Sequence, residues 1–189
     1  GRLILDPKPP FLSEDDALKI LLSRKKYVDA VVITGGEPAM NKDLPAFIRR
    51  LKENGFHVKL DTNGFYPETL RECLPYLDYI AMDVKTSLDK YRLLGAEDTE
   101  KLLRSVKIIK EGRVDYEFRN TVVPGIVTEE DIHEIGRIVE GARRFAFQQF
   151  RPSETLDEAF NYVRPYSSDV IIRFSKIMEK YVSEVILRI

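Results

Sequence analysis

The sequence contains a single cysteine and no tryptophan among its 189 residues. One thiol excludes a disulfide framework and is typical of a reducing compartment, so we expect a cytoplasmic protein. No apolar run approaches the roughly 20 residues of a membrane-spanning helix, and the start lacks the apolar core of a signal peptide. The formal net charge of −1 gives no excess of either sign that would attract nucleic acid or an anionic membrane.

The size and composition suit a folded globular protein. Hydrophobic residues make up 43% of the chain and charged residues 32%. The length is sufficient for one domain with a substantial core. Neither a linker nor a low-complexity segment divides the sequence. We therefore expect residues 1–189 to form a single domain.

Short apolar segments rich in β-branched and aromatic residues alternate with amphipathic helical segments. Strands in such an alternation form a mostly parallel sheet with right-handed crossover helices. The sequence therefore predicts an α/β fold. The expected strands cover residues 30–34, 58–62, 79–84, 116–123, 145–150 and 185–189.

The most informative segment is 31–38, Val-Val-Ile-Thr-Gly-Gly-Glu-Pro, in which a strand ends in two glycines, an acid and a proline. Gly35 and Gly36 permit a sharp turn and let a ligand approach bare backbone groups. No lysine or serine follows them, so a phosphate-binding loop of the Walker type is not expected. The charge of Glu37 makes a ligand with an ammonium group the better fit. An ordinary strand-to-helix turn is the alternative.

Two further strands end in charged residues, one in Asp61 and the next in Asp83 with Lys85. Because carboxyl ends of parallel strands meet at one edge of a sheet, the two carboxylates should lie close together. Like charges at short range need a cation between them, which Lys85, a ligand ammonium or a monovalent ion could supply. Lys85 follows Asp83 by two residues, so in a strand both side chains point to one face. Helix caps or surface ion pairs are the alternative interpretation.

Arg119 lies in a strand whose alternation puts it on one face with Glu117 and Thr121. An arginine inside a barrel meets a carboxylate, which belongs either to a ligand or to a structural ion pair. Gln148 and Gln149 close the next strand. Whichever of the two glutamines faces the interior is a candidate hydrogen-bond donor.

Residues 34–38 resemble the motif of radical S-adenosylmethionine (SAM) enzymes that meets the amino group of SAM. Residues 61–64, 83–85 and 119–125 resemble later motifs of one branch, the activating enzymes of glycyl radical enzymes. Residues 148–152 together with residues 155–157 resemble in particular the anaerobic ribonucleoside-triphosphate reductase activating proteins. The resemblance covers nearly the whole chain and implies a (βα)6 barrel of the radical SAM type.

This resemblance also implies a SAM site. Gly35, Gly36 and Glu37 would hold the SAM ammonium. The residues implied to line the rest of the site are Asp61, Asn63, Asp83, Lys85, Arg119 and Gln149. Lys85 and Arg119 would be the catalytic residues among them.

In this family SAM is cleaved reductively to methionine and a 5′-deoxyadenosyl radical, which takes a hydrogen atom from a backbone glycine of the partner enzyme. The implied cofactors are SAM and a [4Fe–4S] cluster. The implied partners are a glycyl radical enzyme, in the first place anaerobic ribonucleotide reductase, and an electron donor such as flavodoxin or ferredoxin. The implied setting is anaerobic.

The cysteine content departs from the family pattern. The cluster needs three cysteines spaced C-x-x-x-C-x-x-C, whereas the only cysteine, Cys73, lies on the apolar stripe of a short helix and is expected in the core. In the family that motif follows the first strand and precedes a segment like residues 1–5. We therefore expect a partial barrel without the first strand and the cluster loop. We also expect a cluster only in a full-length protein and no activity of this chain alone.

Two other interpretations stay open. A cluster-free (βα) barrel, either a lyase such as an aldolase or an isomerase, would use Lys85 as a base or Schiff-base former with Asp61 or Asp83 as its partner. A non-catalytic binding module would have kept the pocket without the cluster.

Overall fold

The computed structural model of the chain describes residues 12–152 and 158–189. A 6-stranded parallel sheet has the order β1-β2-β3-β4-β5-β6, so each strand pairs with its neighbours along the sequence. The sheet is open, because β1 and β6 each pair with a single strand of the described chain. The expected α/β fold with a partial barrel is confirmed. Residues 1–5 and the motif residues 155–157 lie outside the described residues.

All of the expected strands are present, each shifted by no more than one residue from its predicted bounds. The register sets Asp61 beside Ala81 and Asp83 beside Arg119. Residues that the sequence separates widely therefore meet at one edge of the sheet. The strands are β1 (Ala30–Ile33), β2 (His57–Thr62), β3 (Tyr79–Asp83), β4 (Asp115–Val122), β5 (Arg144–Gln149) and β6 (Glu184–Arg188).

Side-chain caps open two of the α-helices, α2 and α6. Ser13 Oγ accepts a hydrogen bond from the Asp16 N–H at the start of α2, and a capping box of Thr128 and Asp131 opens α6. In the described part of the chain no helix is long and apolar enough to cross a membrane. The α-helices are α2 (Glu14–Ser23), α3 (Leu44–Glu53), α4 (Pro67–Cys73), α5 (Thr99–Glu111), α6 (Glu129–Ile138) and α7 (Ser168–Met178). The short 3₁₀ helices are η1 (Pro38–Met40), η2 (Leu74–Tyr76), η3 (Leu88–Leu94) and η4 (Glu158–Tyr162).

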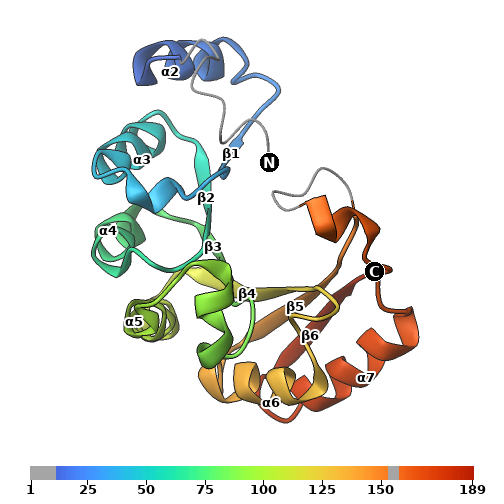
Figure 1. Cartoon of the computed structure of the whole chain (residues 1–189). Helices are drawn as coiled ribbons and strands as arrows, with labels where there is room; N and C mark the ends of the chain where they lie inside the picture. The colour runs from blue at the N-terminus through green and yellow to red at the C-terminus, as the bar shows by residue number, and fades with distance from the viewer. Residues whose placement is uncertain (1–11, 153–157) are drawn as a thin grey trace.

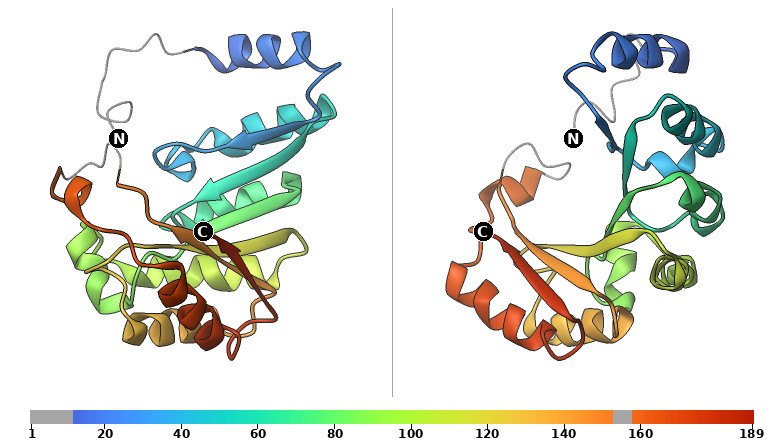
Figure 2. Two further views of the ribbon diagram at one scale, coloured as in Figure 1. Left: turned by 90° about the vertical axis from the view of Figure 1, so that its right-hand side faces the viewer. Right: turned by 180° about the vertical axis from the view of Figure 1, so that it is seen from behind.

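The sheet is curved, and helices α3 to α7 lie along its outer side (Figures 1 and 2). The hydrophobic core fills the space between these helices and the outer side of the strands. Leu60, Ile80, Phe118 and Phe145 are all fully buried there. Each such side chain contributes about 1.5–3 kcal/mol on burial. Because the outer side carries the core, the inner side of the same strands is free to be polar.

Two segments in which the sequence predicted no helix contain short 3₁₀ helices. Residues 86–95 hold η3. Gly95, with φ of +77°, follows its last residue as the C-cap, and the ring of Tyr91 in η3 is buried. Residues 151–165 hold η4. Such 3₁₀ turns are too short to show an amphipathic repeat, so the sequence pattern did not reveal them.

Candidate active site

The turn after β1 has the open backbone that its sequence predicts. Gly35 and Gly36 have φ angles of +92° and +56°, which glycine adopts far more readily than other residues. A Cβ atom added at either position would meet nothing within 4 Å in the described structure. The backbone of this turn is therefore accessible to a ligand at the carboxyl end of β1.

The Glu37 carboxylate ties the end of β1 to the end of β2. Its Oε1 accepts hydrogen bonds from Thr62 Oγ1 at 2.7 Å and from the Ala39 N–H at 3.1 Å. Its Oε2 accepts from the Asn63 N–H at 2.6 Å, and Asn63 Oδ1 in turn accepts from the Phe65 N–H at 3.0 Å. Both carboxylate oxygens thus have partners within the protein. Oε2 has one donor and can accept another, so Glu37 and the backbone of the glycine turn are both candidate contacts for an ammonium.

Arg119 joins the ends of three neighbouring strands. Its Nε donates to Asp83 Oδ1 at 2.8 Å, and its Nη1 donates to Asp61 Oδ2 at 3.1 Å. Of the two partners considered for Arg119, the structure shows the internal ion pair. The cation between the two carboxylates is therefore Arg119, which was not among the three sources of positive charge considered from the sequence, namely Lys85, a ligand ammonium and a monovalent ion.

Most of this ion-pair cluster is shielded from water. The side chains of Arg119 and Asp61 are 11% and 18% exposed, and that of Asp83 is 34% exposed. Burial opposes the charged guanidinium, but the charges of Asp83 and Asp61 outweigh it and raise the pKa of Arg119. Arg119 is therefore a permanent cation on the inner face of the sheet.

One oxygen of the cluster lacks a hydrogen-bond donor. Asp61 Oδ1 is buried and receives no hydrogen bond from the described residues. Lys59 Nζ lies 3.2 Å from this oxygen, so the two form an ion pair, although the contact lacks hydrogen-bond geometry. Buried polar atoms are rarely left without a partner in the functional state. This oxygen is consequently a candidate acceptor for a ligand.

Lys85 lies just beyond β3, which ends at Asp83, so strand alternation does not set the direction of its side chain. The residue is exposed, and its ammonium has no hydrogen bond or ion pair with the residues that the structure describes. Its backbone, by contrast, is bonded on both sides, because the Lys85 N–H donates to Tyr91 Oη and its carbonyl accepts from Asn120 Nδ2. Lys85 therefore offers a free cation on a fixed backbone.

Gln149 requires a correction. The register pairs Gln148 with Thr121, which shares the face of Arg119, and pairs Gln149 with the buried Val122. Gln149 Nε2 donates to the backbone carbonyl of Tyr166 at 3.2 Å. The inward-facing glutamine is therefore Gln148, and the assignment of Gln149 to a cofactor site is wrong because alternation places its side chain on the opposite face.

A second ion pair on the inner face was not predicted. Arg188 on β6 donates two hydrogen bonds to Glu117 on β4, at 2.9 and 2.7 Å. Glu117 is 1% exposed; burial raises its pKa, but the bonds from Arg188 outweigh burial and hold the pKa below its usual value. The available signal was the alternation that puts Glu117 on the Arg119 face, and the partner on β6 could not be read from it.

The residues present do not fit an iron–sulfur cluster. Cys73 is the one cysteine of the sequence, it is fully buried, and burial raises the pKa of its thiol to about 12. A cluster ligand must be a thiolate. In the described ranges no group of three or more His, Cys, Asp or Glu side chains is arranged to hold a metal ion.

The residues at the carboxyl ends of β1 to β4 do fit a zwitterionic ligand such as SAM. The open turn at Gly35 and Gly36 offers backbone groups, and Asp61 offers an oxygen without a donor. Arg119 and Lys85 offer positive charge for a carboxylate, one held in place and one free. Both signs of charge are thus present at the carboxyl ends of β1 to β4.

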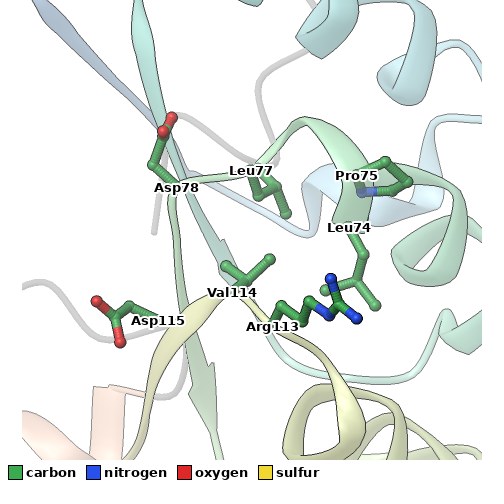
Figure 3. Close-up of a pocket in the computed structure, with 7 residues that line it drawn as sticks. All are labelled: Leu74, Pro75, Leu77, Asp78, Arg113, Val114 and Asp115. Carbon is green, nitrogen blue, oxygen red and sulfur yellow. The ribbon is translucent and has the colours of Figure 1, made fainter.

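A hollow on the surface lies elsewhere (Figure 3). It is formed by η2 and by the segments that lead into β3 and β4, so it lies at the amino ends of these strands. In parallel α/β folds the carboxyl ends of the strands carry the function. The hollow is therefore distinct from the candidate site. Its lining residues are Leu74, Pro75, Leu77, Asp78, Arg113, Val114 and Asp115.

Comparison with known proteins gives consistent matches. The family model of the radical SAM superfamily matches residues 4–139. A candidate glycyl-radical enzyme activating enzyme of Methanocaldococcus jannaschii is 38% identical over 171 residues, covering 86% of this chain and 71% of that protein. A 7-carboxy-7-deazaguanine synthase of Thermococcus kodakarensis is 30% identical over 159 residues, covering 82% of this chain and 60% of that protein.

Two further matches concern pyruvate formate-lyase activation. The pyruvate formate-lyase-activating enzyme of Clostridium pasteurianum is 26% identical over 176 residues, covering 89% of this chain and 73% of that protein. The crystal structure of a domain of the corresponding enzyme from Bacteroides vulgatus superposes with a TM-score of 0.67 at 17% identity, over 83% of this chain and 97% of that domain, and supports the fold. The chain therefore belongs to the radical SAM superfamily, on the branch of the glycyl-radical enzyme activating enzymes.

Proposed function

We propose that the inner face of the sheet binds SAM and that this chain acts in an enzyme that introduces a glycyl radical into a partner enzyme. The observation that carries the proposal is the Arg119 cluster with Asp61 and Asp83, next to the glycine turn at the carboxyl ends of β1 and β2. Membership of the radical SAM superfamily supplies the identity of the ligand.

Each polar group of SAM has a candidate partner. The ammonium would donate to the backbone of Gly35 and Gly36 and to the Glu37 carboxylate. The carboxylates of Asp61 and Asp83 would supply negative charge nearby. The SAM carboxylate would accept hydrogen bonds from Arg119, whose planar guanidinium suits a carboxylate. The side-chain amide of Asn63, next to the glycine turn, is a further candidate donor.

Lys85 and Arg119 are the proposed catalytic residues. The Lys85 ammonium would contact either the SAM carboxylate or the backbone of the partner enzyme. Its position directly after the end of β3, beside Asp83 of the ion-pair cluster, and its exposed ammonium support this role. Arg119 would hold SAM in one orientation, which removes motional freedom before the reaction.

In this family SAM bound at a reduced [4Fe–4S] cluster supplies the radical that removes a hydrogen atom from a glycine. The three thiolates of such a cluster are not present among these 189 residues, which contain one cysteine. The roles proposed for this chain's own residues are accordingly to bind SAM, to orient it and to exclude water.

For the partner we propose anaerobic ribonucleotide reductase, with flavodoxin or ferredoxin as the electron donor. The support is the resemblance of residues 148–152 to activating proteins of that reductase. Pyruvate formate-lyase is the alternative partner, because two of the matched proteins carry its name. A third outcome, favoured by the 30% identity to one relative, is the formation of 7-carboxy-7-deazaguanine.

The first test measures SAM binding by calorimetry. Asp83→Asn removes a carboxylate that would attract the SAM ammonium. Losing one member of a charge pair between protein and ligand costs about 2–5 kcal/mol of binding, so the SAM affinity should fall about 100-fold. Lys85→Met should slow radical formation more than it weakens SAM binding. The matched control is Asp115→Asn, since Asp115 forms an exposed pair with Arg143 at the opposite end of β4. Equal SAM affinity in all three variants and the wild type would refute the site.

The second test identifies the reaction. The natural gene product, purified anaerobically, is incubated with SAM, reductant and each candidate partner separately. Electron paramagnetic resonance then measures the glycyl radical, and chromatography measures 7-carboxy-7-deazaguanine. A radical on the reductase alone supports the proposed partner. A radical on pyruvate formate-lyase, or the deazaguanine product, assigns the chain to another substrate.

A further inference from the structure

The backbone around Lys85 is held by side chains from two other elements. The Lys85 N–H donates to Tyr91 Oη at 2.8 Å, from η3. Asn120 Nδ2, from β4, donates to the carbonyls of Val84 at 2.8 Å and Lys85 at 3.0 Å. These bonds occupy both peptide groups of Lys85, at the point where the regular ladder of β3 has ended.

Lys85 is exposed between two fully buried neighbours. Val84 and Thr86 are each 0% exposed, and Thr86 Oγ1 donates to the carbonyl of Ile126 at 2.9 Å. Of residues 84–86 only Lys85 is exposed to solvent, and its ammonium has no partner in the described structure.

Asn120 occupies a buried position, where a polar side chain is unfavourable. It is 1% exposed, and its Oδ1 has no hydrogen-bond partner in the described ranges. An unpaired buried amide oxygen is destabilising, and an apolar residue of similar volume would avoid it. The amide nitrogen of Asn120, by contrast, donates hydrogen bonds to the backbone carbonyls of Val84 and Lys85.

We infer that Tyr91 and Asn120 are positioning residues that aim the Lys85 ammonium at the ligand on the inner face. Both are buried, and the register places Asn120 on the face opposite Arg119, so they act through the Lys85 backbone. A lysine side chain has a long flexible stem, and fixing its Cα limits the positions that its ammonium reaches. The inference rests on the proposed function, in which Lys85 contacts SAM or the partner enzyme.

Tyr91→Phe tests the inference, because it removes one hydroxyl and keeps the ring that packs against Phe65. Amide exchange at the Lys85 N–H should become roughly tenfold faster, as expected for the loss of one hydrogen bond. In the natural gene product the kcat for radical formation should fall about 10- to 100-fold through misplacement of the amine. KM for SAM should change by less than about twofold, because binding by other residues persists.

The matched control is Tyr116→Phe. Tyr116 Oη also accepts a backbone hydrogen bond, from the Arg143 N–H at 3.2 Å, but it lies at the amino end of β4. It should lose similar stability and leave kcat unchanged. Equal falls in kcat for the two tyrosine variants would mean that the loss reflects general destabilisation, and the inference would be overturned.

A double-mutant cycle separates this inference from the proposed function. In the Lys85→Met background, Tyr91→Phe should have no further effect on kcat, because the group that it aims is gone. Additive effects would overturn the positioning role while leaving the function of Lys85 intact. If Lys85→Met alone leaves kcat unchanged, the catalytic assignment and the inference both fail.

Asn120→Leu provides an independent variant if Tyr91→Phe does not fold. Leucine has a similar volume and no donor for the carbonyls of Val84 and Lys85. The same pattern is expected, namely faster exchange near Lys85, a lower kcat and no added effect in the Lys85→Met background. An Asn120→Leu protein with wild-type kcat would overturn the inference.

Discussion

Replacing Arg119 by methionine should destabilise the protein far more than replacing an exposed arginine. The substitution keeps much of the apolar stem of the side chain. It removes the guanidinium that balances the negative charges of Asp61 and Asp83, whose carboxylate oxygens lie 3.1 and 2.8 Å from its nitrogens. Removing one partner of a buried ion pair costs about 3–5 kcal/mol. Asp83 is 34% exposed and Lys59 stays near Asp61, so the lower end of that range applies.

The assay is urea denaturation at pH 7, with Arg71→Met as the matched control. Arg71 pairs with Glu68 at 2.9 Å, a similar distance, but both side chains are 59% exposed. Exposed pairs of this kind contribute about 0–1 kcal/mol. Adding Asp83→Asn to Arg119→Met should restore part of the loss, because it removes the repulsion between the two carboxylates. A loss no larger than that of Arg71→Met, without recovery in the double variant, would refute the reasoning.

Three further predictions concern other parts of the inner face and core. Glu37→Gln should lower the free energy of unfolding by about 1–3 kcal/mol, because an NH₂ group replaces an oxygen that accepts backbone hydrogen bonds. An unchanged denaturation midpoint would contradict this. The pKa of Glu117 is held low in the folded state, so its contribution is present above the unfolded pKa of about 4.3 and is lost as the pH falls through the folded value. Stability of the wild type should therefore drop below about pH 4.3, and Glu117→Gln should flatten that drop in denaturation curves taken across the acid range. Reconstitution of the 189-residue chain with iron and sulfide should give no stoichiometric [4Fe–4S] cluster, measured by iron counting and absorbance, because Cys73 is the sole thiol. A bound cluster would show that other ligands suffice.

The sheet could be predicted from the sequence because each strand carries a local signal. Segments such as the one around Leu60 or Ile80 are apolar and end at polar or glycine residues, and the helices between them have a clear apolar stripe. Alternation of these two patterns leaves few topologies. The strand order in the structure is the simplest of them.

The site could be predicted only as a set of strand ends. Asp61, Asp83 and Arg119 were expected near one another because parallel strands end at one edge. Which cation lies between the carboxylates depends on the register between β3 and β4, and that register is set by packing rather than by any local pattern. The sequence could therefore not decide which cation lies between Asp61 and Asp83.

The same limit explains the two remaining differences. A shift of one residue moves a side chain to the other face of the sheet, so the choice between Gln148 and Gln149 needed the register with β4. The Glu117–Arg188 pair joins residues 71 positions apart. No periodicity in the sequence connects positions on two strands that are themselves separated by β5.

Side-chain bonds between strand ends hold the site in a sheet that does not close. Glu37 connects the end of β1 to that of β2, Arg119 connects β2, β3 and β4, and Asn120 connects β4 to the segment after β3. A backbone ladder aligns each strand with its neighbour but ends where the strands end. Asp61, Asp83 and Arg119 lie on the paired strands themselves, whereas the glycine turn, Asn63 and Lys85 lie just beyond the strand ends. Binding groups must stay within about 0.5 Å of their working geometry. These cross-links extend the ordered part of the sheet to the candidate ligand-binding residues, and this explains why several of the polar side chains there bond to each other rather than face outward.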